Sequence, residues 1–268
     1  MAATDAGDET RDGGELAALG GRYGAARVDA AERRRRIRAT FDGIAPGYDR
    51  ANDLMSLGLH RRWKRRLVAG VTTAGPVLDL AGGTGDVAAR LRRTAPARLV
   101  VNGDPSRAML AVDRRRHGAV PALALEAERL ALRDGALAAV TCAFGLRNLT
   151  DPPAALAEIA RVLRPGGRLH LLEFSTPERW LRPLYRRLSA RLLPWIGGRV
   201  TGHTDAYRYL AQSIDAFPTK EAVSAALGAA GLRVERVEPL AWSIAAIHVA
   251  RRPPPETGVD AGVGAGAS

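Results

Sequence analysis

Short apolar runs alternate with longer segments of helical periodicity between residues 31 and 251. The apolar runs cover residues 77–80, 99–101, 123–125, 137–144, 169–174, 234–237 and 244–249, and each predicts a β-strand. Several of the intervening segments carry apolar residues at the three- and four-residue spacing of an amphipathic helix. Strands that alternate with helices are typical of α/β domains, so the pattern predicts one domain around a largely parallel, seven-stranded sheet.

The clearest helix prediction precedes the fifth strand. Asp151 is suited to cap this helix and Pro152 to occupy its first position, and the Pro-Gly-Gly sequence at residues 165–167 is expected to end it. The apolar stripe of the helix consists of Leu156, Ile159, Ala160 and Leu163. This stripe predicts a helix that packs on the sheet.

A second apolar stripe lies between the fifth and sixth strands. It consists of Leu181, Leu184, Tyr185, Leu188, Leu192 and Trp195. Arginines occupy other positions of the same segment, so the pattern predicts an amphipathic helix. Because this helix interrupts the series of strands, we expect a helical cap inserted over residues 178–216.

The two ends of the chain lack a periodic apolar pattern. Residues 1–30 are rich in Gly, Ala and Asp, and residues 252–268 are rich in Pro and then in Gly and Ala. We expect both to be disordered tails, which leaves residues 31–251 as the folded domain. The start of the chain is acidic where a signal peptide is basic, and no apolar run approaches the roughly 18 residues of a spanning helix. We therefore expect a soluble, cytoplasmic protein.

Composition excludes several kinds of site. Cys142 is the single cysteine, so an internal disulfide, a multi-thiolate zinc site and an iron–sulfur cluster are excluded, and we expect no metal. The 268 residues include 40 Lys and Arg against 28 Asp and Glu, a net charge of +12. Only Lys64 and Lys220 are lysines, and motifs of nucleic-acid recognition are missing, so we expect no nucleic-acid partner.

A glycine-rich turn follows the first predicted strand. The run from Val77 to Asp86 reads VLDLAGGTGD and leads into a helical pattern. Missing Cβ atoms let a ligand approach the backbone, and the helix start supplies free N–H groups. About 20 residues beyond the turn the next strand ends at Asp104, where nucleotide-binding α/β folds place a carboxylate for ribose hydroxyls. Together these features predict a nucleoside site.

The glycine turn alone leaves the ligand open. The sequence Gly83-x-Gly85-x-x-Ala88 also satisfies the loose dinucleotide fingerprint, and a turn that only packs a helix on the sheet is the structural alternative. Two details favour S-adenosylmethionine over a nicotinamide cofactor. Asp79 lies inside the strand before the turn, and a Leu-Arg-Pro-Gly-Gly sequence at residues 163–167 precedes the fifth strand. Class I methyltransferases, which have a Rossmann-like fold, show both.

Five separated blocks of the chain carry distinctive motifs. The blocks are residues 41–65 (FDGIAPGYDRANDLMSLGLHRRWKR), 78–86 (LDLAGGTGD), 144–151 (FGLRNLTD), 172–177 (LEFSTP) and 207–214 (YRYLAQSI). In these blocks the chain resembles one known family, the ubiquinone/menaquinone biosynthesis C-methyltransferases, and the resemblance extends from about Thr40 to His248. The resemblance implies a class I S-adenosylmethionine-dependent methyltransferase with a seven-stranded, mostly parallel sheet and a helical cap.

The resemblance also implies which residues bind the cofactor. It places Thr84 in the loop, Asp104 at the ribose, and Glu126 and Ala127 at the adenine. The full candidate set is Asp79, Gly82, Thr84, Asp104, Glu126, Ala127 and Ala143. The chain departs from the family, which usually has Asn-Ala at residues 126–127 and Ser at residue 143. A glutamate at position 126 retains the capacity to accept a hydrogen bond from the adenine amino group.

The family's acceptor is the reduced, hydroquinone form of a polyprenylated ring. The resemblance therefore implies C-methylation of demethylmenaquinol to menaquinol, with a benzoquinol of the ubiquinone pathway or a soluble phenolic or polyketide metabolite as alternatives. A non-enzymatic cofactor-binding scaffold is a third reading. Our catalytic candidates are Arg147, Tyr207 and His248, and the sequence also leaves His60, His203 and Asp205 open. Tyr48 and Asp49 are better suited to a gate or to cofactor contacts.

An acceptor with an isoprenoid tail implies contact with a membrane surface. Three features suit this role: the basic cluster at residues 61–66, the arginine run at residues 33–36, and the arginine-flanked stripe at residues 181–195. Solvated arginines and a packed cap helix are the structural alternative. We therefore expect transient, peripheral contact with the inner face of the cell membrane, and the sequence leaves a homodimer open.

Overall fold

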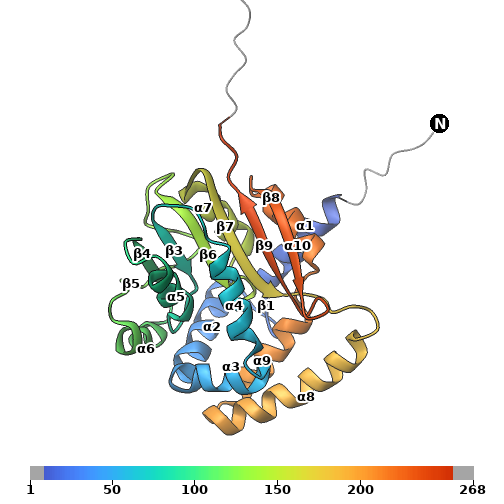
Figure 1. The fold of residues 1–268 in the computed structure, drawn as a ribbon. Coiled ribbons are helices and arrows are strands. Elements are labelled where there is room, and N and C mark those ends of the chain that lie inside the picture. Colours follow the sequence, from blue (N-terminus) through green and yellow to red (C-terminus); the bar gives the residue numbers. More distant parts are fainter. Residues whose placement is uncertain (1–8, 256–268) are drawn as a thin grey trace, which may run out of the picture.

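The computed structural model describes residues 9–255 and is built around one seven-stranded sheet (Figure 1). The strands lie in the order β5-β4-β3-β6-β7-β9-β8. Pairing is parallel from β5 to β7 and antiparallel between β7, β9 and β8. Their bounds are β3 (Val77–Leu80), β4 (Val100–Gly103), β5 (Ala122–Leu123), β6 (Leu137–Ala143), β7 (Leu163–Phe174), β8 (Arg233–Leu240) and β9 (Ala245–Arg251). The predicted seven-stranded, mostly parallel sheet is confirmed.

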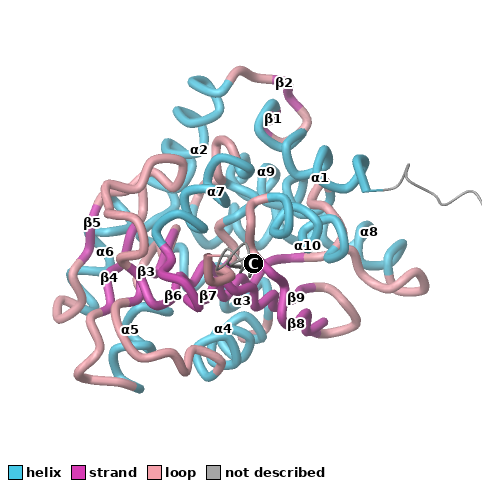
Figure 2. The backbone as a smooth tube through the Cα atoms, turned by 90° about the horizontal axis from the view of Figure 1, so that it is seen from above, coloured by secondary structure: helices cyan, strands magenta, loops and turns pink. Residues whose placement is uncertain are grey.

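Helices cover both faces of this sheet (Figure 2). On one face lie α4 (Leu59–Ala69) and α5 (Asp86–Thr94), whose apolar residues share a core with β3, β4 and β9. On the other lie α1 (Glu9–Ala18), α7 (Pro152–Val162) and α10 (Lys220–Ala229), which share the second core. No helix among the described residues combines the length and apolar character needed to span a bilayer.

A further group of helices lies at the carboxyl ends of the parallel strands (Figure 1). It comprises α2 (Ala30–Ile44), α3 (Tyr48–Ser56), α6 (Arg107–His117), α8 (Arg182–Thr201) and α9 (Thr204–Asp215). Ile44, Met109 and Tyr207, from three of these helices, share a small core of their own. Since α8 and α9 occupy residues 182–215, they coincide with the segment expected to form the cap. Ligand sites of open α/β sheets lie at this edge.

Helix α7 begins as expected but ends earlier. Asp151 caps it by accepting a hydrogen bond from the Ala154 N–H at 3.1 Å, and Pro152 is its first residue. The helix ends at Val162, whereas the sequence pattern extended it to Leu163. Leu163 instead pairs with Leu137 as the first residue of β7, and the Pro-Gly-Gly sequence sits in an irregularity of that strand. Tertiary pairing has overridden the helical periodicity here.

The expected N-terminal tail is wrong for residues 9–30. This segment forms α1 and a small hairpin of β1 (Arg22–Tyr23) and β2 (Ala26–Arg27). Leu16 and Leu19 are buried in the core that contains α7 and α10. Among residues 14–30, Leu16 and Leu19 are the buried residues. Two leucines in a segment rich in Gly and Ala give no periodic apolar pattern, so the sequence did not predict this burial. Residues 1–8 and 256–268 lie outside the described residues.

At the other end the fold extends slightly past residue 251. The Arg252 guanidinium donates hydrogen bonds to the carbonyls of Arg161 at 2.7 Å and Leu163 at 2.5 Å. The backbone of Arg252 also bonds with Gly166 and Gly167. These contacts join the end of the last strand to the junction between α7 and β7.

Asp79 links the centre of the sheet to the helix that follows the glycine turn. Its carboxylate accepts a hydrogen bond from the Thr141 hydroxyl at 2.7 Å and from the Ala88 N–H at 3.0 Å. The side chain is completely buried, and burial raises the pKa of its carboxyl to about 7 from the ordinary 3.8. Asp79 therefore braces β3 against β6 and α5.

We predict that Asp79→Asn makes folding less sensitive to pH. Because the folded-state pKa lies above the unfolded one, the protonated carboxyl of Asp79 stabilises the fold; this stabilisation is lost as pH rises through about 7. An asparagine amide satisfies both neighbours and stays neutral. Urea unfolding from about pH 5 to about pH 8 should show the parent losing stability relative to the variant as pH rises.

The exposed Asp205 provides the matched control, because its carboxyl is 90% exposed. Asp205→Asn should leave the pH dependence of unfolding unchanged. Parallel stability curves for the parent and Asp79→Asn would contradict a protonated, buried carboxyl at position 79.

Candidate functional site

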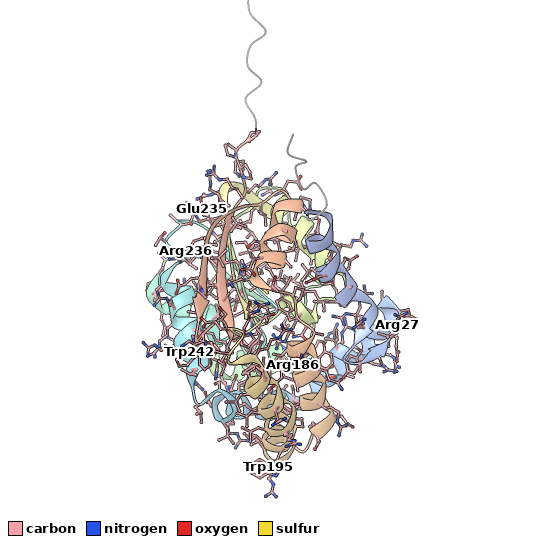
Figure 3. The ribbon with its side chains drawn as sticks, turned by 90° about the vertical axis from the view of Figure 1, so that its right-hand side faces the viewer. Arg27, Arg186, Trp195, Glu235, Arg236 and Trp242 are labelled. Atoms are coloured by element: carbon pink, nitrogen blue, oxygen red, sulfur yellow. The ribbon has the colours of Figure 1, made fainter. Side chains whose placement is uncertain are left out.

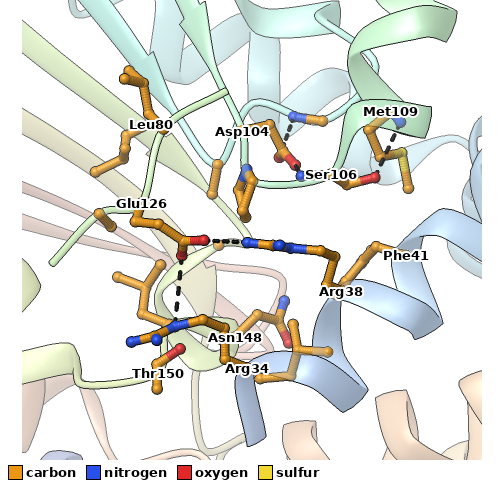
Figure 4. Close-up of a pocket in the computed structure, with 18 of the residues that line it drawn as sticks. Arg34, Arg38, Phe41, Leu80, Asp104, Ser106, Met109, Glu126, Asn148 and Thr150 are labelled. Atoms are coloured by element: carbon orange, nitrogen blue, oxygen red, sulfur yellow. Dashed lines mark hydrogen bonds and ion pairs between the residues drawn. The ribbon is translucent and has the colours of Figure 1, made fainter. Parts of the chain in front are cut away.

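Two cavities open at the carboxyl ends of the parallel strands. The first is bounded on one side by α2 and on the other by the loops that follow β3, β4, β5 and β6 (Figure 4). Four of the expected cofactor residues line it, namely Asp104, Glu126, Ala127 and Ala143. Leu80, Met109 and Leu125 supply apolar walls. This combination of apolar walls and a few polar groups is typical of a small-molecule site.

Asp104 is the central acid of the first cavity. Its carboxylate accepts hydrogen bonds from the Gly83 N–H at 2.9 Å and the Ser106 N–H at 2.8 Å. The residue is 8% exposed, and burial raises the pKa of its carboxyl to about 6. Each carboxylate oxygen accepts a single backbone hydrogen bond, so acceptor capacity remains for a ligand. Gly83 lines the same cavity with a positive φ of 57°, which glycine adopts readily.

Glu126 lines the first cavity and is engaged by α2. Its carboxylate forms an ion pair with Arg38 and lies 4.0 Å from Arg34 (Figure 4). Neither arginine was expected at the site: Arg34 belongs to the arginine run expected at a membrane surface, and Arg38 had no predicted role. The position of α2 across the loop after β5 brings both to the glutamate.

Asp79, Gly82 and Thr84 do not line either cavity, and their expected contacts with the cofactor stay a prediction. Thr84 is buried and its hydroxyl donates to the Asp49 carboxylate at 2.8 Å. A Cβ at Gly82 would overlap the side chains of Asn102 and Asp79, so this glycine permits a close contact within the protein. All three shape the loop that bounds the cavity.

The segment from α2 to α3 is fastened to three successive strand ends. The Thr84–Asp49 hydrogen bond holds it to the loop after β3. The Ser106 hydroxyl, after β4, donates to the Asp42 carboxylate at 2.6 Å. The Arg38–Glu126 ion pair is the third contact, after β5. One wall of the first cavity is therefore made by a segment that precedes the sheet in the sequence.

The second cavity is larger and mostly apolar, with a volume of about 280 Å³. It lies between α3, α4, α8, α9 and the ends of β6 and β7. Its apolar lining includes Ile44, Met55, Leu57, Leu59, Trp63, Phe174, Leu188, Leu192, Leu210 and Ile244. One of the polar residues in this lining is Arg147, which lies in the loop after β6. An apolar cavity with isolated polar groups suits a ring that carries few oxygens.

Arg147 is buried in an ion pair with Glu173. Its guanidinium Nη1 donates to the Glu173 carboxylate at 2.6 Å and to the Phe144 carbonyl at 2.6 Å. The two side chains are 4% and 2% exposed. Nε of Arg147 has no hydrogen-bond partner among the described residues, and the guanidinium lies 5.0 Å from the Phe174 ring centre. Glu173 stands in the LEF block of the sequence but was not identified as a partner.

Arg33 supports the backbone of the same loop. It is buried, and its guanidinium donates to the carbonyls of Arg147 at 3.0 Å and Leu149 at 3.0 Å. Burial lowers the pKa of Arg33. Arg33, the first residue of the arginine run at 33–36, is therefore an interior residue that holds backbone carbonyls. Arg35 and Arg36 pair with Glu32, so they bond within α2.

Tyr207 lines the second cavity and His248 does not. Tyr207 is 1% exposed, and burial raises the pKa of its phenol to about 12. His248 lies in β9, where its Nε2 is 3.0 Å from the Lys220 carbonyl, away from both cavities. We therefore withdraw His248 as a catalytic candidate. Strand alternation places its side chain toward α10.

Of the other candidates, His60 lies in the lining of the second cavity. Its Nδ1 is 2.7 Å from the Ser56 hydroxyl, and burial lowers the pKa of the imidazole to about 4. The ring is thus neutral near pH 7. His203 and Asp205 line neither cavity.

The two cavities meet at three aromatic residues. Phe41, Tyr48 and Phe144 line both of them. Phe144 has a positive φ of 61°, a conformation that side chains with a Cβ rarely adopt and that often marks functional sites. Its N–H bonds to the Leu172 carbonyl at 2.7 Å, which holds the turn after β6. These three aromatic residues therefore form a shared boundary between the two cavities.

Within the described residues, no three His, Cys, Asp or Glu side chains gather as a metal site. The ionisable groups that line the two cavities include buried Arg147, Lys64, Tyr207 and Tyr209, the neutral imidazole of His60, and the carboxylates of Asp104 and Glu126. Groups of these kinds can hold and orient ligands and can move protons.

Comparison of the chain with known proteins identifies its family. The model of the ubiE/COQ5 methyltransferase family matches residues 28–252. A "Ubiquinone/menaquinone biosynthesis C-methyltransferase UbiE" of Rubrivivax gelatinosus is 45% identical over 86% of this chain and 92% of its own length. A "Demethylmenaquinone methyltransferase" of Thermus thermophilus is 48% identical over 80% of this chain and all of its own length.

A solved structure shares the fold. It is a SAM-dependent methyltransferase of Thermotoga maritima with a TM-score of 0.57 and 17% identity, covering 81% of this chain and 99% of that protein. The sheet order and this similarity establish the class I methyltransferase fold. The match over residues 28–252 also includes α2, α3 and the helices expected to form the cap, which border the two cavities. The chain belongs to the ubiE/COQ5 methyltransferase family and is a methyltransferase.

Proposed function

We propose that the protein transfers a methyl group from S-adenosylmethionine to a ring carbon of demethylmenaquinol, giving menaquinol and S-adenosylhomocysteine. The observation that carries this proposal is the aromatic junction of Phe41, Tyr48 and Phe144 between a cavity with a buried acid and an apolar cavity with a buried arginine. Transfer needs the donor and the acceptor carbon in line and in contact. Two cavities that share the boundary of Phe41, Tyr48 and Phe144 would hold the donor and the acceptor next to each other.

The residues of the first cavity suit the methyl donor. The Asp104 carboxylate is nearly buried, faces the cavity and retains acceptor capacity for ribose hydroxyls. Leu80, Leu125 and Met109 provide apolar surface for a planar base. When bound, S-adenosylmethionine supplies an electrophilic methyl group on a positively charged sulfur. Aromatic faces at the junction favour a positive charge nearby.

The second cavity suits a reduced aromatic ring. A quinol carbon is nucleophilic once a neighbouring hydroxyl loses its proton, whereas a quinone is electron-poor and does not attack. We assign to Arg147 the role of hydrogen-bond donor to this oxygen, because the residue lines the cavity and its guanidinium has a donor, Nε, without a partner among the described residues. A guanidinium stabilises a phenolate. Tyr207 is the second group placed to orient the ring.

The choice of a naphthoquinol rests on the relative of Thermus thermophilus, whose printed name is demethylmenaquinone methyltransferase and whose whole length is matched. The name of the Rubrivivax gelatinosus relative includes both quinone types, so a benzoquinol is the second candidate. A soluble phenolic acceptor is the third, favoured by the departures at Glu126 and Ala143 from the usual family residues.

The proposal is tested by incubating the protein with labelled S-adenosylmethionine and a short-chain demethylmenaquinone, with and without a reductant. We expect labelled menaquinone only in the reduced sample, because only the quinol carbon is nucleophilic. A matched short-chain demethylated benzoquinone tests the second candidate in parallel. Cofactor binding with no labelled product from reduced demethylmenaquinone would overturn the assigned acceptor.

Substitutions in the two cavities should separate binding from turnover. Asp104→Asn removes one acceptor, and we predict about a tenfold rise in the Kd for S-adenosylhomocysteine by calorimetry. Arg147→Met combined with Glu173→Met removes the buried pair without leaving one charge unpaired. We predict that this double variant binds S-adenosylhomocysteine like the parent and has a kcat lower by about 100-fold. Equal loss of affinity and turnover in the double variant would make Arg147 a structural residue only.

A further inference from the structure

The exposed apolar side chains of this protein gather at one end of the fold. Apart from Leu99 and Leu123, every exposed large apolar side chain among the described residues belongs to α3, α4, the turn between them, α8 or the loops before α8 and β9. These residues are Leu54, Leu57, Leu59, Trp180, Leu184, Leu188, Leu192, Trp195 and Trp242. Leu57 is 86% exposed, and the rings of Trp180 and Trp242 meet edge to face at 6.0 Å. We call these nine residues the apolar rim.

Helix α8 contributes an apolar stripe that the rest of the protein covers only in part. Leu184, Leu188, Leu192 and Trp195 follow one another at spacings of four, four and three residues, which places them on one face of the helix. Each is about half exposed. The helix instead packs through Ile196 and Gly197, and a Cβ at Gly197 would overlap the Tyr207 ring. Figure 3 shows Trp195 at the lower extremity of the molecule.

The apolar rim is continuous with the second cavity. Leu57 and Leu59, at the turn from α3 to α4, line the cavity and are exposed to solvent. Leu188 and Leu192 of α8 do the same. Four of the nine rim residues therefore border the cavity proposed to hold the acceptor ring.

Unpaired arginines flank the rim. Arg62 and Arg65 of α4, and Arg182, Arg187 and Arg191 of α8, are exposed, and none has a carboxylate within ion-pair distance among the described residues. By contrast, the arginine run at residues 33–36 is engaged by carbonyls, Glu32 and Glu126. The run therefore does not supply the free basic surface that the sequence suggested. Of the three basic features expected from the sequence, those on α4 and α8 keep exposed arginines without an ion pair among the described residues.

We propose that the apolar rim and its flanking arginines dock on an anionic phospholipid bilayer, with the mouth of the second cavity facing the lipid. Apolar side chains and tryptophans enter the interface, and arginines meet the phosphate groups. A second copy of this chain fits less well, because two such surfaces would bring unpaired arginines together. This inference rests on the proposed acceptor only for its purpose: a cavity of about 280 Å³ holds a ring and leaves a long tail in the membrane.

The surface is tested first without substrate, by co-sedimentation with vesicles of phosphatidylcholine with and without phosphatidylglycerol. Arg187→Gln combined with Arg191→Gln should lower partitioning onto anionic vesicles about 30-fold. Leu184→Ser combined with Trp195→Ser should lower it about tenfold. Neither pair lines a cavity. Matched controls are Arg114→Gln with Arg115→Gln, and Leu99→Ser with Leu123→Ser, which are exposed elsewhere and should bind like the parent.

Binding that ignores salt and phosphatidylglycerol, or that the controls weaken equally, would overturn the proposal. Sedimentation velocity without vesicles tests the other occupant: a dimer that Leu184→Ser with Trp195→Ser converts to monomer would assign the rim to a second copy and overturn lipid docking. The proposal predicts that this substitution leaves the oligomeric state unchanged.

The second test separates this inference from the proposed function. Methyl transfer is measured with a tail-less acceptor in solution and with a long-tailed acceptor embedded in anionic vesicles. The two double variants, Arg187→Gln with Arg191→Gln and Leu184→Ser with Trp195→Ser, should keep the parent's rate on the soluble acceptor. Both should lose activity on the embedded acceptor. Equal rates for parent and variants on the embedded acceptor would contradict docking, whereas inactivity of all proteins on both acceptors would contradict the assigned acceptor and leave the vesicle-binding result standing.

Discussion

The buried ion pair between Arg147 and Glu173 holds together two strand ends beside which the second cavity lies. It joins the turn after β6 to the end of β7 at 2.6 Å, in surroundings almost closed to water. Removing one partner of such a pair costs about 3–5 kcal/mol, because the other charge stays buried. Arg33 holds the carbonyls of the same turn from α2. One loop thus connects the sheet, the wall of the first cavity and the polar group of the second.

The wall of the first cavity is held by polar contacts together with a small apolar core. The segment of α2 and α3 is held by Thr84–Asp49, Ser106–Asp42 and Arg38–Glu126, each at the end of a different strand. Ile44 of α2 also shares a core with Met109 of α6 and Tyr207 of α9. Exposed ion pairs such as Arg38–Glu126 are worth about 1 kcal/mol or less, so this contact adds little to the attachment.

Much of the fold and part of the site were predictable from the sequence. The strands and the glycine turn follow from local sequence patterns, and the structure has the predicted sheet. Asp104 and Arg147 also follow from local patterns, and they line the cavities at the carboxyl ends of the strands. Asp79, Gly82 and Thr84 lie in the same motif, but their side chains or backbone contact the protein itself, which no local pattern distinguishes from ligand contact. The roles of Glu173, Arg33 and Arg38 depend on contacts between distant segments. Residues 9–30 are ordered through the packing of Leu16 and Leu19 against α7 and α10, which lie far away in the sequence.

The central claim is that donor and acceptor occupy separate cavities that meet at Phe41, Tyr48 and Phe144. The most direct measurement is calorimetric titration of a short-chain menaquinol into the protein with and without saturating S-adenosylhomocysteine, a pair that cannot react. The account predicts a ternary complex, with menaquinol binding at least as tightly when the first cavity is filled. Mutual exclusion of the two ligands would contradict it.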